Sequence, residues 1–170
     1  MKFFLLDADD RNEQPHFLDW YEQINPMQYA SWTFPRLNSL AVSLSEDADF
    51  MDIISYPYFM LSKEFANLVR MYDDTIQFKY AVAHDLKNKR HFIYSIPLIE
   101  VIDCLSPESE LNRDSSVLRH VVLRRATVRE HTLFKIGGVK NCYIVGSLEF
   151  LESAFRREVT GLRIREILLV

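Results

Sequence analysis

Apolar residues recur at helical spacing in three parts of the chain. Phe65, Leu68, Val69 and Tyr72 follow one another at i, i+3, i+4 and i+7, which predicts an amphipathic helix over 63–72 with Ser62 as its N-cap. A second helix is expected with Ser147 as its N-cap, with Leu148, Leu151 and Phe155 on one face and with Gly161 well placed to end it. A third is predicted after Pro15 and before Asn25-Pro26, with these residues on one face: Phe17, Trp20, Tyr21 and Ile24.

Much of the remaining chain alternates with period two or runs in short apolar stretches, as strands do. A hairpin is predicted over 76–96 around the polar turn 85–90, with one buried face made of its aromatic residues. We expect a polar loop over 106–116 and a turn at Gly137-Gly138. Further strands or extended segments are predicted at 2–6, 57–61, 98–102, 117–125, 132–136, 142–145 and 162–170. The expected fold class is therefore α+β, a mostly antiparallel sheet with two or three short helices that closes in a C-terminal strand–helix–strand.

The chain has 170 residues and contains no repeats, low-complexity tract or Gly/Ser-rich linker, which favours a single domain over 1–170. Its formal net charge of −4 argues against a general nucleic-acid binder. The apolar run near Met1 is four residues long, too short for a signal peptide or a membrane span, so a cytoplasmic protein without a membrane partner is expected.

Charge is distributed unevenly along the chain. Residues 1–85 hold 6 Lys/Arg against 14 Asp/Glu, and residues 86–170 hold 14 against 10. This asymmetry favours a polarised surface, unless the two halves interleave in space and average it out. The densest acidic stretch contains Glu46, Asp47, Asp49 and Asp52.

Few residues suggest catalysis. Asp7-Ala8-Asp9 follows a short apolar run, as in phosphotransferases that place a nucleophile and a general acid around Mg²⁺, but Arg11 stands where that motif has Thr or Val. The five histidines show no metal-ligand spacing, although His84 and His91 flank the predicted turn and are expected to face each other. Cys104 and Cys142 form no Cys-x-x-Cys motif, and both are expected to be free thiols. We therefore predict no catalytic, cofactor-binding or metal-ligating residue.

Two segments carry a resemblance to a known family. One is Val101–Leu105 followed by Ser109-Glu110. The other runs from Tyr143 to Phe150 and continues through Glu152, Arg156-Arg157, Thr160-Gly161-Leu162 and Glu166-Ile167. Across 57–170 the chain resembles immunity proteins of bacterial polymorphic-toxin systems, a group known mainly as a domain of unknown function in Proteobacteria. Residues 1–56 show no such similarity and form a divergent N-terminal part.

The resemblance implies a small cytoplasmic protein that binds a cognate toxin domain and neutralises it without catalysis. Many such toxins act on nucleic acids through basic grooves, so we predict that Glu46, Asp47, Asp49 and Asp52 form the docking patch. Two other functions stay open. One is a metal-dependent phosphatase that uses Asp7 and Asp9, and the other is an adaptor module of a secretion system.

Overall fold

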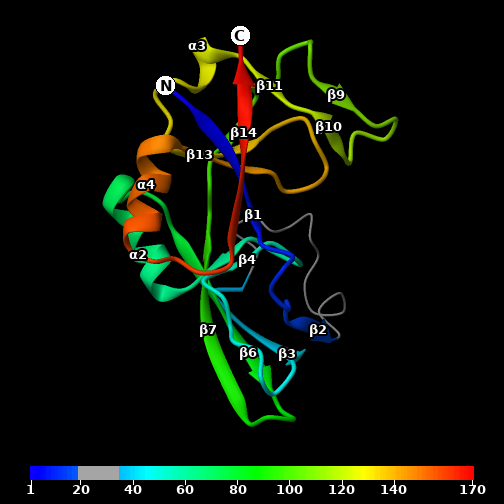
Figure 1. Cartoon of the computed structure of the whole chain (residues 1–170), viewed down its shortest axis with the longest axis vertical. Helices are drawn as coiled ribbons and strands as arrows, with labels where there is room; N and C mark the ends of the chain where they lie inside the picture. Colours follow the sequence, from blue (N-terminus) through cyan, green and yellow to red (C-terminus); the bar gives the residue numbers. More distant parts are fainter. Residues whose placement is uncertain (19–34) are drawn as a thin grey trace. The chain divides into compact units, whose positions relative to one another are not determined.

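The structure, a computed structural model, describes residues 1–18 and 35–170 (Figure 1). The chain divides into two compact units, and each is built from separate stretches of sequence. Unit 1 comprises 1–7, 99–158 and 163–170, and unit 2 comprises 8–98 and 159–162. The described residues contain three helices and several sheets, which confirms the expected α+β class. None of these helices is both long and apolar enough to cross a membrane.

Unit 2 is built on a six-stranded sheet. Its order is β2 (His16–Leu18), β3 (Leu37–Ser43), β6 (Phe78–Asp85), β7 (Arg90–Pro97), β5 (Met60–Leu61) and β4 (Ile53–Ile54). The β3–β6 pair is parallel and the other four pairs are antiparallel. The predicted helix after Pro15 is wrong for 16–18, because these residues pair with Ala41–Ser43 and bury Phe17 as a strand. The rest of that predicted helix lies outside the described residues.

The helix of unit 2, α2 (Lys63–Tyr72), has the predicted bounds and cap. The Ser62 hydroxyl accepts a hydrogen bond from the Phe65 amide at 3.2 Å, which satisfies one of the unpaired donors at the helix start. Ser62 is itself fully buried, and the helix buries Phe65, Leu68 and Val69. The spacing of the apolar residues therefore identifies the buried face correctly for these three residues, whereas Tyr72, predicted on the same face, is exposed.

The hairpin β6–β7 forms as predicted, but its aromatic residues do not share one face. Ala83 lies opposite Phe92 and Ala81 opposite Tyr94, whereas Tyr80 lies opposite Ser95. The turn has four residues between Asp85 and Arg90, so each even-numbered residue of β6 pairs with an odd-numbered residue of β7. Tyr94 is fully buried, whereas Tyr80 is on the other face and only partly covered.

Unit 1 is built on a second six-stranded sheet. Its order is β11 (Val122–Leu123), β14 (Leu162–Leu169), β1 (Phe3–Ala8), β13 (Ile144–Ser147), β12 (Leu133–Ile136) and β8 (Val101–Ile102). β1 and β14 run in opposite directions (Figure 1), β13 is antiparallel to both β1 and β12, and the pairs β11–β14 and β12–β8 are parallel. Residues from β1, β12 and β13 form a core in which the rings of Phe3 and Phe134 meet edge to face at 5.7 Å.

Helix α4 (Leu148–Arg156) lies between β13 and β14 in the chain, and its predicted end at Gly161 is wrong, because Arg157 is its C-cap. Ser147 caps it by accepting a hydrogen bond from the Phe150 amide at 3.4 Å, as predicted. Gly146 allows β13 close to its neighbours, since a Cβ there would lie 3.0 Å from a Leu6 methyl group and 3.2 Å from the Phe150 ring. The small residue and the cap therefore set the start of α4.

The segment between β8 and β12 differs most from its prediction. The expected strand 117–125 is wrong in extent, because it consists of β10 (Leu118–His120) and β11, and α3 (Arg125–Val128) starts at its last residue. The expected loop 106–116 contains β9 (Glu110–Leu111), which pairs with β10. The pairing breaks at Val121, where the chain leaves β10 and joins the main sheet as β11.

Candidate functional site

Arg90 holds the acidic segment that the sequence analysis singled out. It is the first residue of β7, and its guanidinium reaches the segment between β3 and β4. Nη2 donates to the Ser45 carbonyl at 2.9 Å, and Nη1 donates to the carbonyls of Ala48 at 2.8 Å and Glu46 at 3.3 Å. The guanidinium carbon also lies 5.7 Å from the centre of the Phe50 ring. One side chain therefore fixes the backbone of the segment at three carbonyls.

Asp85 orients Arg90. Its fully buried carboxylate accepts from Nη2 of Arg90 at 2.8 Å and from Nε at 3.2 Å. Asn88 donates to the same carboxylate at 2.7 Å and to the Leu44 carbonyl at 2.8 Å. The Asn88 hydrogen bond, followed by the Arg90 contacts, lowers the pKa of Asp85 below its usual value. The hairpin turn is thus tied to the start of the acidic segment by a hydrogen-bond network around the buried Asp85 carboxylate.

Glu13 is a further acidic residue at this segment. Its carboxylate accepts a hydrogen bond from the Ser45 amide at 2.8 Å, and this contact lowers the pKa of Glu13. Together with Arg90 and Asn88 it fixes residues 44–48 from outside the segment. The four anchoring residues Glu13, Asp85, Asn88 and Arg90 were not predicted as part of a site, because polar residues in a turn are typical of a solvated turn.

The structure separates the four predicted docking residues into two groups. Glu46, Asp47 and Asp49 are exposed and follow one another along the anchored segment. Asp52 instead supports the fold, because its carboxylate accepts from the Thr160 amide at 2.7 Å and the Thr160 hydroxyl at 2.8 Å. We therefore define the acidic loop as Glu46, Asp47 and Asp49, and we remove Asp52 from the docking patch.

Each aspartate of the Asp-x-Asp motif forms an ion pair with an arginine. Asp7, in unit 1, forms an ion pair with Arg163 at 3.1 Å. Asp9, in unit 2, is buried, and its carboxylate accepts from Nε and Nη2 of Arg11 at 3.0 and 2.6 Å and from the Arg11 amide at 3.0 Å. Arg11 thus neutralises the carboxylate that the phosphatase hypothesis assigns to a metal or a proton transfer. The described part of the chain holds no cluster of three or more His, Cys, Asp or Glu suited to a metal ion.

His84 and His91 are directly opposite each other across β6 and β7, which confirms the predicted pairing. Cys104 is fully buried and free, and burial raises the pKa of its thiol to about 11. At neutral pH this sulfur is therefore protonated and suited to core packing. Cys142 is a free, exposed thiol.

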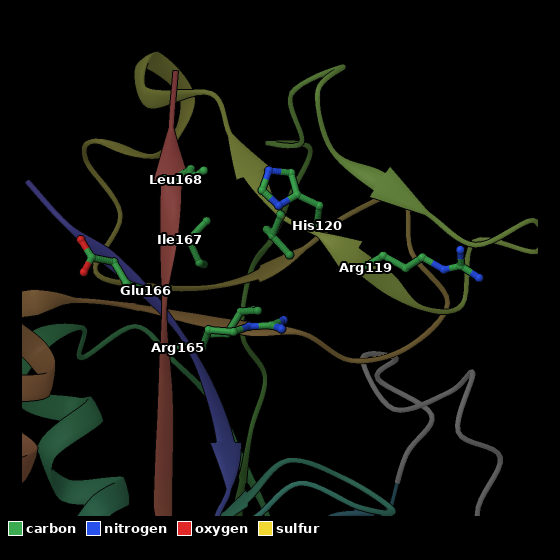
Figure 2. A pocket seen from close by; sticks show the side chains of 8 residues that line it. Arg119, His120, Arg165, Glu166, Ile167 and Leu168 are labelled. Carbon is green, nitrogen blue, oxygen red and sulfur yellow. The ribbon is translucent and has the colours of Figure 1, made fainter.

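A small cavity with basic side chains lies in unit 1 between β14 and the β10–β11 segment (Figure 2). Its volume is about 110 Å³, and it is lined by Leu5, Arg119, His120, Val121 and residues 165–168 of β14. Figure 2 shows Arg165 and His120 on one side of β14 and Glu166 on the other, while Arg119 extends away from β14. Glu166 forms an ion pair with Lys2 at 2.8 Å.

Several other arginines of residues 86–170 form surface ion pairs. Arg124 pairs with Asp103 at 3.2 Å, and Arg156 pairs with Glu152 at 3.9 Å. Among the described residues, Arg119, His120 and Arg165 have no such partner. These three residues were not predicted as a group, because only the path of the chain after β10 brings them to one cavity.

Comparison with protein-family models finds no match for this chain, and comparison with curated proteins finds no match either.

Proposed function

We propose that the chain is a non-catalytic immunity protein that binds a cognate bacterial toxin domain and neutralises it in the cytoplasm. The acidic loop carries this proposal. Its three exposed carboxylates stand on a backbone that Arg90 and Glu13 hold in place, so little conformational entropy is lost when a basic surface docks there. An anionic patch of this kind steers association with a basic groove.

The charges of unit 2 support the same proposal. This unit holds 8 Lys/Arg against 13 Asp/Glu, whereas unit 1 holds 12 against 11. The acidic character therefore stays with one compact unit and is not averaged out by the fold. A negative field over a whole unit acts over a longer range than three carboxylates and raises the association rate at low ionic strength.

Together with this function we propose the predicted architecture of the fold, a mostly antiparallel sheet that closes in a strand–helix–strand. Antiparallel pairs such as β1–β13, β12–β13 and β6–β7 support a mostly antiparallel architecture closed by a strand–helix–strand, and the parallel pairs β3–β6, β8–β12 and β11–β14 weigh against it. The resemblance of 57–170 to immunity proteins supports the functional class. The secretion-system adaptor stays an alternative, and it predicts a stable complex with a secretion component.

The decisive experiment co-expresses the chain with the C-terminal domain of the protein encoded by the adjacent reading frame. We expect that domain to kill cells alone and the chain to restore growth. A second arm measures association of the two purified proteins with Glu46, Asp47 and Asp49 all changed to Lys. We expect association about 10- to 100-fold slower at low salt, since the steering field is reversed.

A matched control changes Asp103, Glu108 and Glu130 to Lys, which alters the net charge equally on exposed residues of unit 1. Equal slowing by both triple variants would assign the effect to net charge and remove the acidic loop from the interface. Absence of rescue by the unmodified chain would contradict the immunity function itself.

A further inference from the structure

The outer edge of β14 is paired over only part of its length. β11 pairs with it at two positions, Val122 opposite Leu168 and Leu123 opposite Leu169. β11 is the last strand of the sheet on this side. No described strand therefore lies along the outer edge of β14 before Leu168, while β1 covers the inner edge. An unpaired strand edge is a template on which another strand can form backbone hydrogen bonds.

The hydrogen bonds at the end of β14 show which residues face this edge. The Val170 amide donates to the Leu123 carbonyl at 3.0 Å, and the Val170 carbonyl accepts from the Arg125 amide at 2.7 Å. Both backbone groups of Val170 thus point toward β11. In an extended chain alternate residues direct their backbone groups to the same side, so those of Leu168, Glu166 and Ile164 also point outward.

The odd-numbered residues of β14 direct their backbone amides and carbonyls toward β1. The Gly161 carbonyl, just before β14, accepts from the Asp9 amide at 2.8 Å at the far end of β1, as this alternation requires. Among the described residues, Ile164 and Glu166 therefore present their amides and carbonyls to an edge without a partner strand. An added strand would continue the row that β11 begins at Val122.

The basic cavity lies at this edge. The side chain of Arg165 and the imidazole of His120 lie on the cavity side of β14 (Figure 2), and the apolar residues Leu5, Val121 and Ile167 also line the cavity. Glu110 is opposite His120 in the β9–β10 register, and the two side chains form no ion pair. Glu166 points to the opposite side of β14 and is paired with Lys2. The cation on the cavity side thus has no anion in the described chain.

We propose that an extended segment of a partner protein adds to the outer edge of β14 as a strand and places an acidic side chain beside Arg165. Backbone hydrogen bonds to Ile164 and Glu166 supply affinity, and the arginine supplies the preference for a carboxylate. A second copy of this chain is a poor occupant, because the same edge offers Arg165 no acidic side chain that is not already paired: Glu166 forms an ion pair with Lys2. This binding surface belongs to unit 1 and does not depend on the acidic loop or on the toxin.

The test uses two capped peptides that alternate Thr and Val, one with a central Asp and one with a central Lys, added to the full chain. Amide exchange and amide chemical shifts are measured by NMR. We expect the Asp peptide to slow exchange of the Ile164 and Glu166 amides by about tenfold or more, as a backbone hydrogen bond does. The Arg165 amide, which faces β1, is the internal control and should change little.

Two variants distinguish the contribution of the backbone hydrogen bonds of β14 from that of the Arg165 charge. Ile164→Pro removes an outward amide and should abolish the slowed exchange at Glu166, since proline is tolerated where an edge amide has no partner. Arg165→Glu should weaken binding of the Asp peptide by about five- to tenfold and remove its advantage over the Lys peptide. Arg156→Glu on α4 is the matched control and should bind as the unmodified chain does.

Unchanged exchange at Ile164 and Glu166 with the Asp peptide would overturn the proposal. Equal binding of both peptides to the unmodified chain would overturn the assigned acidic chemistry. If Ile164→Pro fails to fold, Arg165→Glu decides the question alone. Because these measurements involve no toxin, they fail or succeed independently of the rescue experiment.

Discussion

Asp85 and Arg90 are paired directly across the end of the β6–β7 hairpin, and their side chains form an ion pair of 2.8 Å whose carboxylate is fully buried. Arg90 uses its remaining donors on the carbonyls of Ser45, Glu46 and Ala48. Arg90 thus connects the hairpin turn rigidly to the acidic loop. The proposed binding surface depends on two residues that carry none of its exposed negative charge.

We expect Arg90→Lys to loosen the acidic loop while the sheet stays folded. Lysine keeps the positive charge but cannot reach the carboxylate and three carbonyls with a planar fork. Loss of a charge-assisted hydrogen bond costs about 1.5–3 kcal/mol, so opening of residues 44–49 should become about tenfold more frequent or higher. Hydrogen exchange of the loop amides measures this, with those of α2 as the reference.

The pH dependence of stability follows from the lowered pKa of Asp85. A carboxylate whose pKa is lower in the folded than in the unfolded state, where it is about 3.9, contributes stability above the unfolded pKa. That contribution is lost as pH falls through the folded pKa. We therefore expect Asp85→Asn to unfold more readily than the unmodified chain at pH 7, and the difference to shrink progressively below about pH 4.

Urea denaturation at a series of pH values measures this difference. Asp47→Asn removes a carboxylate from an exposed residue of the same loop and is the matched control. A destabilisation by Asp85→Asn that stays constant down to pH 2.5 would contradict the assigned role of the ionised carboxylate.

Local signals in the sequence predicted local features well. Ser62 and the helix that it caps lie within eleven consecutive residues, so capping and apolar spacing suffice to identify them. Ser147 is likewise the predicted cap of α4, but the predicted apolar face of that helix is wrong, because Leu148 and Phe155 are exposed while Phe150, Leu151 and Ala154 are buried. The faces of the hairpin were predicted wrongly, because they depend on whether the turn contains an even or an odd number of residues. Apolar alternation within each strand carries no information about that number.

Long-range contacts explain why the site was predicted only in part. The acidic residues are visible in the sequence as a cluster, but their anchor Arg90 lies more than forty positions away from the carbonyls that it binds. In the sequence Asp52 resembles its acidic neighbours. Only the structure shows that its carboxylate accepts hydrogen bonds from Thr160, 108 positions later. His16–Leu18 form a strand because β3 offers an edge, which outweighs helical spacing over so short a stretch.

We expect Ser62→Ala to destabilise the chain by about 2 kcal/mol, where loss of an N-cap hydroxyl usually costs about 0.5–2 kcal/mol. The effect should be at the high end of the range for caps, since Ser62 is fully buried and the Phe65 amide would lose its side-chain acceptor. Urea denaturation followed by circular dichroism measures the change. Ser43→Ala, an exposed strand residue without a cap, is the control and should alter stability by less than about 0.5 kcal/mol.

Gly161→Ala tests the turn that leads into β14. Gly161 has a φ of 71°, a left-handed conformation that costs a residue with a Cβ about 1–2 kcal/mol. The new Cβ would also lie 2.6 Å from the Met51 Cβ, closer than packed atoms approach, so the backbone must shift. We expect a total loss above about 2 kcal/mol, measured by urea denaturation. Gly138→Ala is the control, because its φ is 76° but no neighbouring atom lies within 4 Å of an added Cβ, so its loss of stability measures the conformational cost alone. Equal losses of stability at both glycines would show that the contact with Met51 contributes nothing.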